Sequence, residues 1–420
     1  MRSVKTIIFA ILFASAVLLL PAAQAQTYTV LHNFTGAQDG AFPQAGLTMA
    51  PTGSLYGTAY QGGEYGYGSV FQLRRSGSGW VFSPIYAFQG GNDGYWPYAR
   101  VIAGPNGSLY GTTAEGGGGG CNLYGCGTVF NLQPPLATVC RNVLCGWTKT
   151  VLYRFTGFQD GYVPLGDLIF DQTGNLYGTA SDGSFPSLGT VYKLTPSYGY
   201  WTEDTLHTFT EGSDGTGPNS GVVFDTAGNL YGTTSTGGGG CFGNLCGAVY
   251  ELSPSGSGWT ETILYAFQGG TDGQSPIGGV IFDPAGNLYG TTSTGGAGGG
   301  GTAFELSPSG NSWTFNLLSS FSGGYGAGPL ASLTRDMAGN LYGTTAGAGT
   351  YQHGSVFRLT PSGGGWTETD LYDFTGGSDG GSPRSIVTLD ANGNLYGTTY
   401  TGGAYDCGDE GCGVVWEITP

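Results

Sequence analysis

Six aspartates recur at the same place in a repeated turn, which reads Gly-Gly-x-Asp-Gly or a variant of it. They are Asp39, Asp93, Asp160, Asp214, Asp272 and Asp379. Carboxylates repeated in this way could bind Ca²⁺ or sugar hydroxyls. However, Asp-Gly is also a common turn dipeptide in which the carboxylate accepts hydrogen bonds from nearby amides. A calcium site needs about six to eight oxygen ligands and each repeat offers one carboxylate, so the turn role is favoured.

Aromatic residues gather close to two of these aspartates. Tyr95, Trp96 and Tyr98 follow Asp93, and Tyr162 follows Asp160, while Tyr124 and Phe242 lie in glycine-rich loops. Exposed rings beside small polar residues are suited to stacking on sugars. The predicted binding residues are therefore these six aromatics with Asp93 and Asp160. The alternative, that the rings plug a channel mouth or cover strand edges, stays open.

Residues for catalysis are few. Arg100 and Arg384 are the charged candidates if the protein is an enzyme, although each could simply pair with a neighbouring carboxylate. His32 and His207 occupy equivalent positions in the repeat, where other copies have Tyr or Ser, and this favours packed strand residues over a general base. We therefore predict no catalytic residue, no metal ligand and no cofactor, with Ca²⁺ as the alternative at the repeated aspartates.

All eight cysteines occur in pairs with the spacing C-x4-C. The pairs are Cys121–Cys126, Cys140–Cys145, Cys241–Cys246 and Cys407–Cys412. In an exported protein this spacing predicts four local disulfides that fasten lengthened loops. A zinc site is less favoured, because zinc sites generally use tighter spacing and bring two pairs together.

The elements that position these residues form a repeat. Leu-Tyr-Gly-Thr occurs seven times at intervals of 53 to 67 residues, and each copy belongs to a unit of four strand-like runs. One such unit consists of residues 221–225, 229–234, 247–252 and 259–267. Four strands at a fixed period of this length are typical of propeller blades. The sequence thus predicts an all-β fold, a seven-bladed β-propeller with four antiparallel strands in each blade.

The two ends of the repeat are out of phase with the blade. The chain ends in a third strand, at residues 413–418, and the segment 26–34 reads as a fourth strand without a blade before it. We therefore predict that residues 26–34 complete the blade formed by 383–420, which removes the exposed strand edges. Nearly all long loops then fall on one face, where we place any function.

Residues 1–25 read as a signal peptide, with a positive start, an apolar stretch and Ala23-Gln24-Ala25 before the cleavage point. Residues 26–420 form the propeller, which we expect to be secreted or periplasmic, monomeric and without a membrane span. The net charge of −16 opposes binding to phosphate backbones, so no nucleic acid partner is expected.

The unit F-T-G-G-x-D-G, D-x-x-G-N-L-Y-G-T-T and G-x-V-F-x-L resembles the Gloeobacter/Verrucomicrobia-type (GloVer) tandem repeat of exported bacterial proteins, over Gln26–Pro420. Its D-x-x-G-N-L-Y core is also similar, over a shorter stretch, to NHL and lactonase-like propeller repeats. The resemblance implies an exported, sometimes surface-anchored repeat protein with no defined activity, and it transfers no catalytic residue.

These observations favour a non-catalytic exported propeller that binds a glycan, a polymer or a protein through its long-loop face. The alternatives are a polysaccharide lyase or hydrolase with a site at the central channel, and a structural envelope protein. A cluster of Asp, Arg and His in one central pocket would favour the enzyme. A broad face studded with aromatic rings would favour binding.

Overall fold

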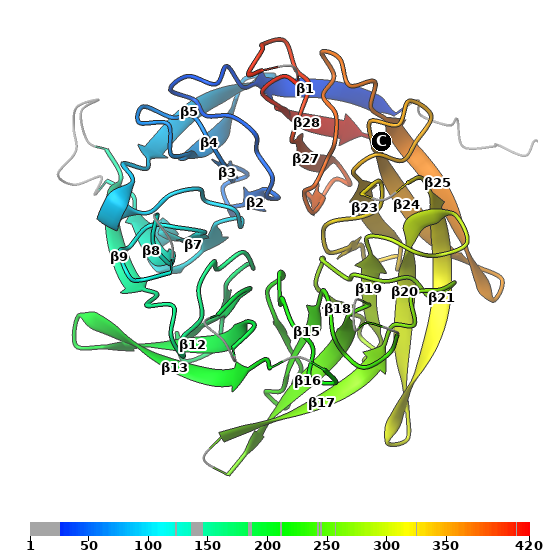
Figure 1. Cartoon of the computed structure of the whole chain (residues 1–420). Coiled ribbons are helices and arrows are strands. Elements are labelled where there is room, and N and C mark those ends of the chain that lie inside the picture. The colour runs from blue at the N-terminus through cyan, green and yellow to red at the C-terminus, as the bar shows by residue number, and fades with distance from the viewer. Residues whose placement is uncertain are drawn as a thin grey trace, which may run out of the picture.

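The computed structural model describes residues 26–121, 124–135, 146–183, 187–210, 212–241, 243, 246–256, 258–324, 326–408 and 410–420. Within this part of the chain, strands form seven four-stranded antiparallel sheets arranged in a ring, as Figure 1 shows. The predicted seven-bladed β-propeller is confirmed. No helix in the described ranges is long and apolar enough to span a bilayer. The predicted signal peptide lies outside these ranges.

Each blade runs from a two-residue inner strand to a long outer strand. Blade 1 holds β2 (Thr48–Met49), β3 (Leu55–Ala59), β4 (Ser69–Ser76) and β5 (Gly79–Ala87). Blade 2 holds β6 (Ile102–Ala103), β7 (Leu109–Thr113), β8 (Thr128–Gln133) and β9 (Thr148–Arg154). Blade 3 holds β10 (Ile169–Phe170), β11 (Leu176–Ala180), β12 (Thr190–Ser197) and β13 (Tyr200–Thr208). Blade 4 holds β14 (Val223–Phe224), β15 (Leu230–Thr234), β16 (Ala248–Ser255) and β17 (Gly258–Ala266).

The remaining blades follow the same plan. Blade 5 holds β18 (Ile281–Phe282), β19 (Leu288–Thr292), β20 (Gly299–Ser309) and β21 (Ser312–Ser322). Blade 6 holds β22 (Thr334–Arg335), β23 (Leu341–Thr345), β24 (Ser355–Ser362) and β25 (Gly365–Asp373). Blade 7 holds β26 (Thr388–Leu389), β27 (Leu395–Thr399), β28 (Val414–Thr419) and β1 (Thr27–Asn33). Two short 3₁₀ turns, η1 (Gly91–Asp93) and η2 (Pro105–Gly107), lie in connections.

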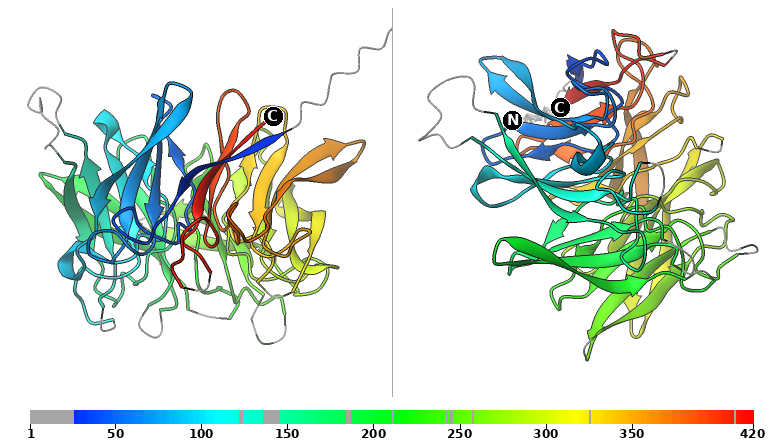
Figure 2. Two further views of the ribbon diagram at one scale, coloured as in Figure 1. Left: turned by 90° about the horizontal axis from the view of Figure 1, so that it is seen from above. Right: turned by 60° about the vertical axis from the view of Figure 1, so that its left-hand side comes forward.

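The ring is closed by pairing between its two ends. Strand β1 runs antiparallel to β28, with partners from Thr27↔Thr419 to Asn33↔Val414. The side view in Figure 2 shows the hairpin turns between the two outer strands on one face of the ring. The loops between second and third strands, together with the connections between blades, lie on the opposite face, here called the loop face. The closure predicted from the phase of the repeat is confirmed.

Each residue of Leu-Tyr-Gly-Thr has its own structural task, as blade 5 illustrates. Leu288 is fully buried in the core, and the Tyr289 hydroxyl bonds to Asp283 in the preceding turn at 3.3 Å. Gly290 faces the ring of Phe304 on the neighbouring strand, and a Cβ on this glycine would lie 2.6 Å from the ring. Thr291 donates a hydrogen bond of 3.1 Å to the Ala331 carbonyl of blade 6. The motif thus builds both the blade and its contact with the next one.

The hydrophobic core is divided among the seams between blades. The described side chains form seven buried clusters, and each combines residues of two adjacent blades. At the closing seam, Phe34 packs with Leu55 and Phe71 of blade 1 and with Val415 of blade 7. Both faces of every sheet are therefore covered, so each blade depends on its neighbours for stability.

Candidate functional site

The six repeated aspartates organise the turns between blades. Each accepts a hydrogen bond from the backbone amide four residues earlier and from a side chain seven residues earlier. The side-chain donors are His32, Tyr86, Tyr153, His207, Tyr265 and Tyr372. Asp160 is only 5 % exposed, and Asp93 also binds Lys149 at 3.0 Å. Both aspartates that were proposed as ligand-binding residues are thus engaged within the protein.

The outer strand of the next blade adds a third residue to each of these arrangements. This residue lies two positions after the Trp near the start of the outer strand. In blade 7 it lies two positions after Gln26, which directly precedes β1. For the six aspartates these residues are Phe82, Lys149, Glu203, Glu261, Phe315 and Tyr28, in order from the seam between blades 7 and 1. Glu368 occupies the corresponding position at the seam between blades 5 and 6, which has no repeated aspartate, and there it accepts a hydrogen bond from Ser319. His32 stacks on Phe82 at 3.6 Å, and Tyr265 stacks on Phe315 at 4.6 Å. We call these groups the seam triads. Either His or Tyr can occupy this strand position, because both side chains bind the aspartate and both have a ring that packs against the third residue.

Glu203 gives one seam a pH dependence. Burial, reinforced by Asp160 and Asp204, raises the pKa of Glu203 to about 7. The folded state therefore keeps this proton while the unfolded chain loses it, so stability falls as the pH rises from about 4.5 to about 7. Replacing Glu203 with Gln should raise the melting temperature by about 2–4 °C at pH 8 and leave it unchanged at pH 4. Thermal unfolding at both pH values checks this, and a gain of equal size at pH 4 would contradict it.

Aromatic side chains of blades 7, 1 and 2 gather on the loop face as six rings in contact with one another and a separate pair, Phe42 and Tyr400, which adjoins them where the Tyr60 amide donates to the Phe42 carbonyl. The members of the whole group are Phe42, Tyr60, Tyr67, Tyr95, Trp96, Tyr98, Tyr124 and Tyr400, here called the aromatic tract. Trp96 lies at its centre, with ring centroids 5.6 Å from both Tyr60 and Tyr124. Tyr124 is 52 % exposed, whereas Trp96 and Tyr60 are half-buried. The tract thus offers several ring edges and faces to a ligand.

The backbone at the centre of the tract is held in an unusual conformation. Trp96 and Phe42 have φ of 58° and 55°, a region that bulky residues seldom occupy. Each directly precedes a proline in the connection between blades. The Trp96 amide donates to the Tyr67 carbonyl of blade 1, and its carbonyl accepts from Ala114 of blade 2, both at 3.0 Å. Two blades therefore hold this residue in place. The same conformation recurs before the corresponding prolines of other blades, at Val163, Ser275 and Ser382, so it belongs to the repeated connection.

The two arginines proposed as charged candidates differ in their surroundings. Arg100 is paired with Asp167, its Nε lying 2.5 Å from the carboxylate. Arg384 lies over the ring of Tyr400, with Cζ 3.9 Å from the ring centroid. Among the described residues no carboxylate makes an ion pair with Arg384. Its guanidinium therefore adjoins the aromatic tract without being neutralised by such a pair.

Two hollows meet at Arg384. One, of about 250 Å³, is lined by the segments before the innermost strands of all seven blades, and includes Tyr98 and Asp167. The other, of about 800 Å³, lies between blades 6 and 7 and is lined by His353, Asp406 and Glu410 among others. Arg384 lines both. The aromatic tract thus adjoins both a polar depression between blades 6 and 7 and the smaller hollow at the mouth of the central channel.

The other proposed residues lie elsewhere or were not described. Tyr162 is half-buried and packs against the core of the seam between blades 2 and 3. Phe242 lies outside the described residues. Phe42, Tyr60 and Tyr400 belong to the tract but were missed from the sequence. Alignment of the repeats could have found two of them, because Tyr60 and Tyr400 directly follow the second strand, where other blades have Ala or Ser.

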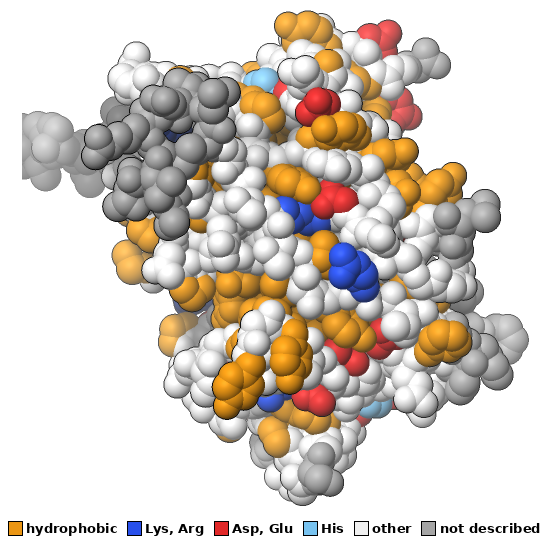
Figure 3. All heavy atoms as spheres, turned by 90° about the vertical axis from the view of Figure 1, so that its left-hand side faces the viewer, with side chains coloured by type: hydrophobic (Ala, Val, Ile, Leu, Met, Phe, Trp, Pro, Cys, Tyr) orange, Lys and Arg blue, Asp and Glu red, His pale blue; other side chains and the backbone are white. Residues whose placement is uncertain are grey.

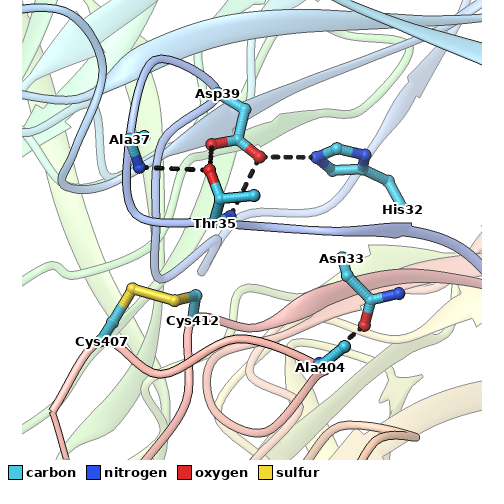
Figure 4. Close-up of a disulfide and its surroundings, with 8 residues drawn as sticks. All are labelled: His32, Asn33, Thr35, Ala37, Asp39, Ala404, Cys407 and Cys412. Atoms are coloured by element: carbon cyan, nitrogen blue, oxygen red, sulfur yellow. Dashed lines mark hydrogen bonds and ion pairs between the residues drawn. A yellow bond between two sulfur atoms is a disulfide. The ribbon is translucent and has the colours of Figure 1, made fainter.

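Three of the four predicted disulfides are formed, namely Cys121–Cys126, Cys241–Cys246 and Cys407–Cys412. The pair Cys140–Cys145 lies outside the described residues. Figure 4 shows Cys407–Cys412 beside the turn in which Asp39 binds His32 and Thr35. Gly36 belongs to this turn, and a Cβ there would lie 2.4 Å from the Cys407 sulfur. Each disulfide thus fastens a loop of the loop face against the next connection.

Charged side chains are sparse on the rim of the ring. Figure 3 shows them in small groups of both signs, separated by large areas of uncharged polar atoms and by patches of hydrophobic side chains. Charged residues make up only 10 % of the sequence. The surface seen in this view is therefore made up mainly of uncharged polar and hydrophobic groups.

The fold and the loop face define a seven-bladed propeller with a group of aromatic side chains on one face. The family model described as the Gloeobacter/Verrucomicrobia repeat matches residues 20–169 and 238–420, so the chain belongs to the Gloeobacter/Verrucomicrobia repeat family. The resemblance seen in the sequence is thereby confirmed. A search of curated proteins finds no match.

Several solved structures are similar to this chain at low identity. A protein from Thermus thermophilus, provisionally described as an oxidoreductase (glucose dehydrogenase), is 16 % identical, with 93 % of this chain and 100 % of that chain covered and a TM-score of 0.42. A provisionally described 6-phosphogluconolactonase from Bacteroides uniformis is 12 % identical, with coverages of 77 % and 82 % and a TM-score of 0.47. A protein of unknown function from Dyadobacter fermentans is 13 % identical, with coverages of 82 % and 97 % and a TM-score of 0.43.

Proposed function

We propose that the protein is an exported, non-catalytic propeller that binds a neutral polysaccharide through the aromatic tract. The observation that carries this proposal is the connected set of rings around Trp96, next to the polar depression that Arg384 lines. Rings that present a face or an edge stack on the C–H surface of a sugar, and adjacent polar groups fix its hydroxyls. The local disulfides are in keeping with an oxidising compartment outside the cytoplasm.

The electrostatics of the site suit hydroxyl groups better than anionic groups. The net charge of −16 disfavours a polyanionic chain. Burial, with a contribution from Tyr400, raises the pKa of Tyr60 to about 12, so this phenol remains a hydrogen-bond donor at neutral pH. The Arg384 guanidinium and the Tyr60 hydroxyl are thus placed to donate to sugar oxygens while the rings supply the apolar contact.

A polysaccharide lyase or hydrolase is the second candidate, and one observation favours it. His353, Asp406, Glu410 and Arg384 line the same hollow between blades 6 and 7, which supplies groups able to act as acid and base. The smaller hollow at the channel mouth is different, since its described lining contains Arg384 and the Asp167 bound to Arg100 but no histidine. Release of reducing or unsaturated ends from a bound polysaccharide would identify an enzyme.

The test uses a variant that copies another blade. Blade 4 has Thr216-Gly217 where blade 2 has Tyr95-Trp96, so the double variant Tyr95→Thr, Trp96→Gly should keep the fold and the positive φ. We expect it to weaken binding to the polysaccharide about 5- to 150-fold, because each of the two stacked rings contributes about 0.5–1.5 kcal/mol. Polysaccharides are first selected by glycan array and pull-down, and affinity is then measured by calorimetry.

A control variant tests whether binding requires the aromatic tract or only an exposed aromatic side chain anywhere on the surface. Tyr198 is fully exposed in the hairpin turn between β12 and β13, on the face opposite the tract. Tyr198→Ala should leave the affinity unchanged. Equal affinity of the wild type and the Tyr95→Thr, Trp96→Gly variant would rule out the tract as the binding site.

A further inference from the structure

The seam between blades 3 and 4 differs from the others in the chemistry of its triad. His207 on β13 lies 2.9 Å from the Asp214 carboxylate and 3.9 Å from the Glu261 carboxylate of β17. One ligand atom from each of the three lies within 4.8 Å of the others. All three side chains are between 13 % and 19 % exposed, so the cluster is sheltered but open to solvent. Imidazole and carboxylate groups are thus brought together at one point of the rim.

The equivalent residues at other seams show what is unusual here. At the seam between blades 7 and 1, the same His–Asp pair, His32 and Asp39, is covered by the ring of Phe82, and Figure 4 shows this pair. At the seam between blades 1 and 2, the third residue is Lys149, whose ammonium neutralises Asp93. At the seam between blades 3 and 4, the third residue is a second carboxylate, as Glu203 is at the seam between blades 2 and 3, but the aspartate here is bound by a histidine and not by a tyrosine.

This second carboxylate lacks compensation from the protein. Among the described residues, no lysine or arginine makes an ion pair with Asp214 or Glu261. The Glu261 Oε1 atom is buried and has no hydrogen-bond partner there. Either a proton or a metal cation must occupy the triad for it to be stable at neutral pH.

We propose that His207, Asp214 and Glu261 bind one divalent transition-metal ion of the Zn²⁺ type. Zinc is bound by imidazole nitrogen and carboxylate oxygen at about 2.0–2.2 Å, so three such atoms can converge on one ion with small rotations of their side chains. Three protein ligands leave the fourth position to water. The ion would connect the outer strands of two blades, so it would stabilise the ring through that seam. This site is separate from the aromatic tract.

The experiment uses untagged protein, residues 26–420, freed of metal with EDTA. ZnCl₂ should bind with a stoichiometry of one ion per chain by calorimetry, and CoCl₂ should give the visible absorption of a low-coordinate site. Zinc should also raise the melting temperature, because an ion that binds only the folded state stabilises it. CaCl₂ should have no effect, since calcium takes oxygen ligands.

Matched variants decide whether the triad is the site. Glu261→Gln keeps the shape of the protonated acid, so it should fold, and it and His207→Ala should each abolish the one-to-one binding of zinc. His32→Ala removes the equivalent histidine from the seam covered by Phe82 and should leave zinc binding intact. No zinc binding by the wild type, or full binding retained in both His207→Ala and Glu261→Gln, would overturn the proposal. A melting temperature that changes with pH but not with added zinc would also overturn the proposal, because it would show that the triad binds a proton and not a metal ion.

Discussion

Removal of residues 26–34 is expected to abolish the folded monomer. Without β1, blade 7 keeps three strands, and the backbone of Val414–Thr419 loses its six partners along β1. The cavity left by Phe34, which is fully buried, opens the seam between blades 7 and 1. Loss of the Phe34 side chain alone should lower the free energy of unfolding by about 3–5 kcal/mol, and loss of the strand pairing lowers it further. The total stability of a typical domain is about 5–15 kcal/mol. Size-exclusion chromatography of chains 26–420 and 35–420 measures the outcome.

A graded version of the same experiment avoids reliance on a deletion. Phe34→Ala should lower stability by about 3–5 kcal/mol, whereas Thr29→Ala, on the exposed side of β1, should change it by about 0.5 kcal/mol or less. A synthetic peptide of residues 26–34 added to the 35–420 chain should restore part of the monomer by pairing with β28. A 35–420 chain that melts like the 26–420 chain would show that closure contributes little.

The fold could be predicted from the sequence because the same residue spacings recur in every repeat. The fixed spacing from Trp80 to Phe88, repeated in the other blades, gives the outer strand, and the phase of residues 26–34 gives the closing pair. These patterns arise from backbone pairing and from core packing, which are the same in every blade. The seven-fold count and the closure were therefore both predicted correctly.

The aromatic tract could be predicted only in part, because it consists of residues that differ from those at the equivalent positions of other blades. The tract joins Tyr400 of blade 7, Phe42 and Tyr60 of blade 1, and Trp96 of blade 2, which are far apart in sequence. Their proximity follows from ring closure and from the positive φ of Phe42 and Trp96, neither of which a composition pattern reveals. The repeated aspartates were more conspicuous in the sequence, yet they serve the turns.

The seam triads show a further limit of pattern reading. His32 and His207 look equivalent in the sequence, and both bind the aspartate seven residues later. Their environments differ because the third residue comes from the following blade, about 50 residues further along the chain, and is Phe82 in one case and Glu261 in the other. Aligning the outer strands of neighbouring blades is what exposes this difference.

The glycine of Leu-Tyr-Gly-Thr is expected to be sensitive to substitution even by alanine, and Gly290 of blade 5 serves as the example. A Cβ at this position would lie 2.6 Å from the ring of Phe304 and 3.2 Å from Val280, so neither side has room for it. Gly290→Ala should therefore destabilise the protein by about 1–3 kcal/mol through overpacking, although alanine is ordinarily neutral or better in a strand. Gly258, in an outer strand with no neighbouring atom within 4 Å of its Cβ position, is the control, and Gly258→Ala should change stability by about 0.5 kcal/mol or less.

Coupling between the two partners distinguishes a steric cause from a backbone one. Phe304→Leu removes the ring that Gly290 faces, so the double variant Gly290→Ala, Phe304→Leu should lose less stability than the sum of the single variants, by about 1 kcal/mol or more. Thermal unfolding of the four proteins in this cycle supplies the comparison. If the stability losses of the two single variants simply add up in the double variant, the glycine is required for its backbone freedom. The cross-strand pairing of glycine with a ring would then not explain the motif. Because the same pair recurs in every blade, from Gly57 with Phe71 to Gly397 with Trp416, a positive coupling at one blade explains why the motif repeats seven times.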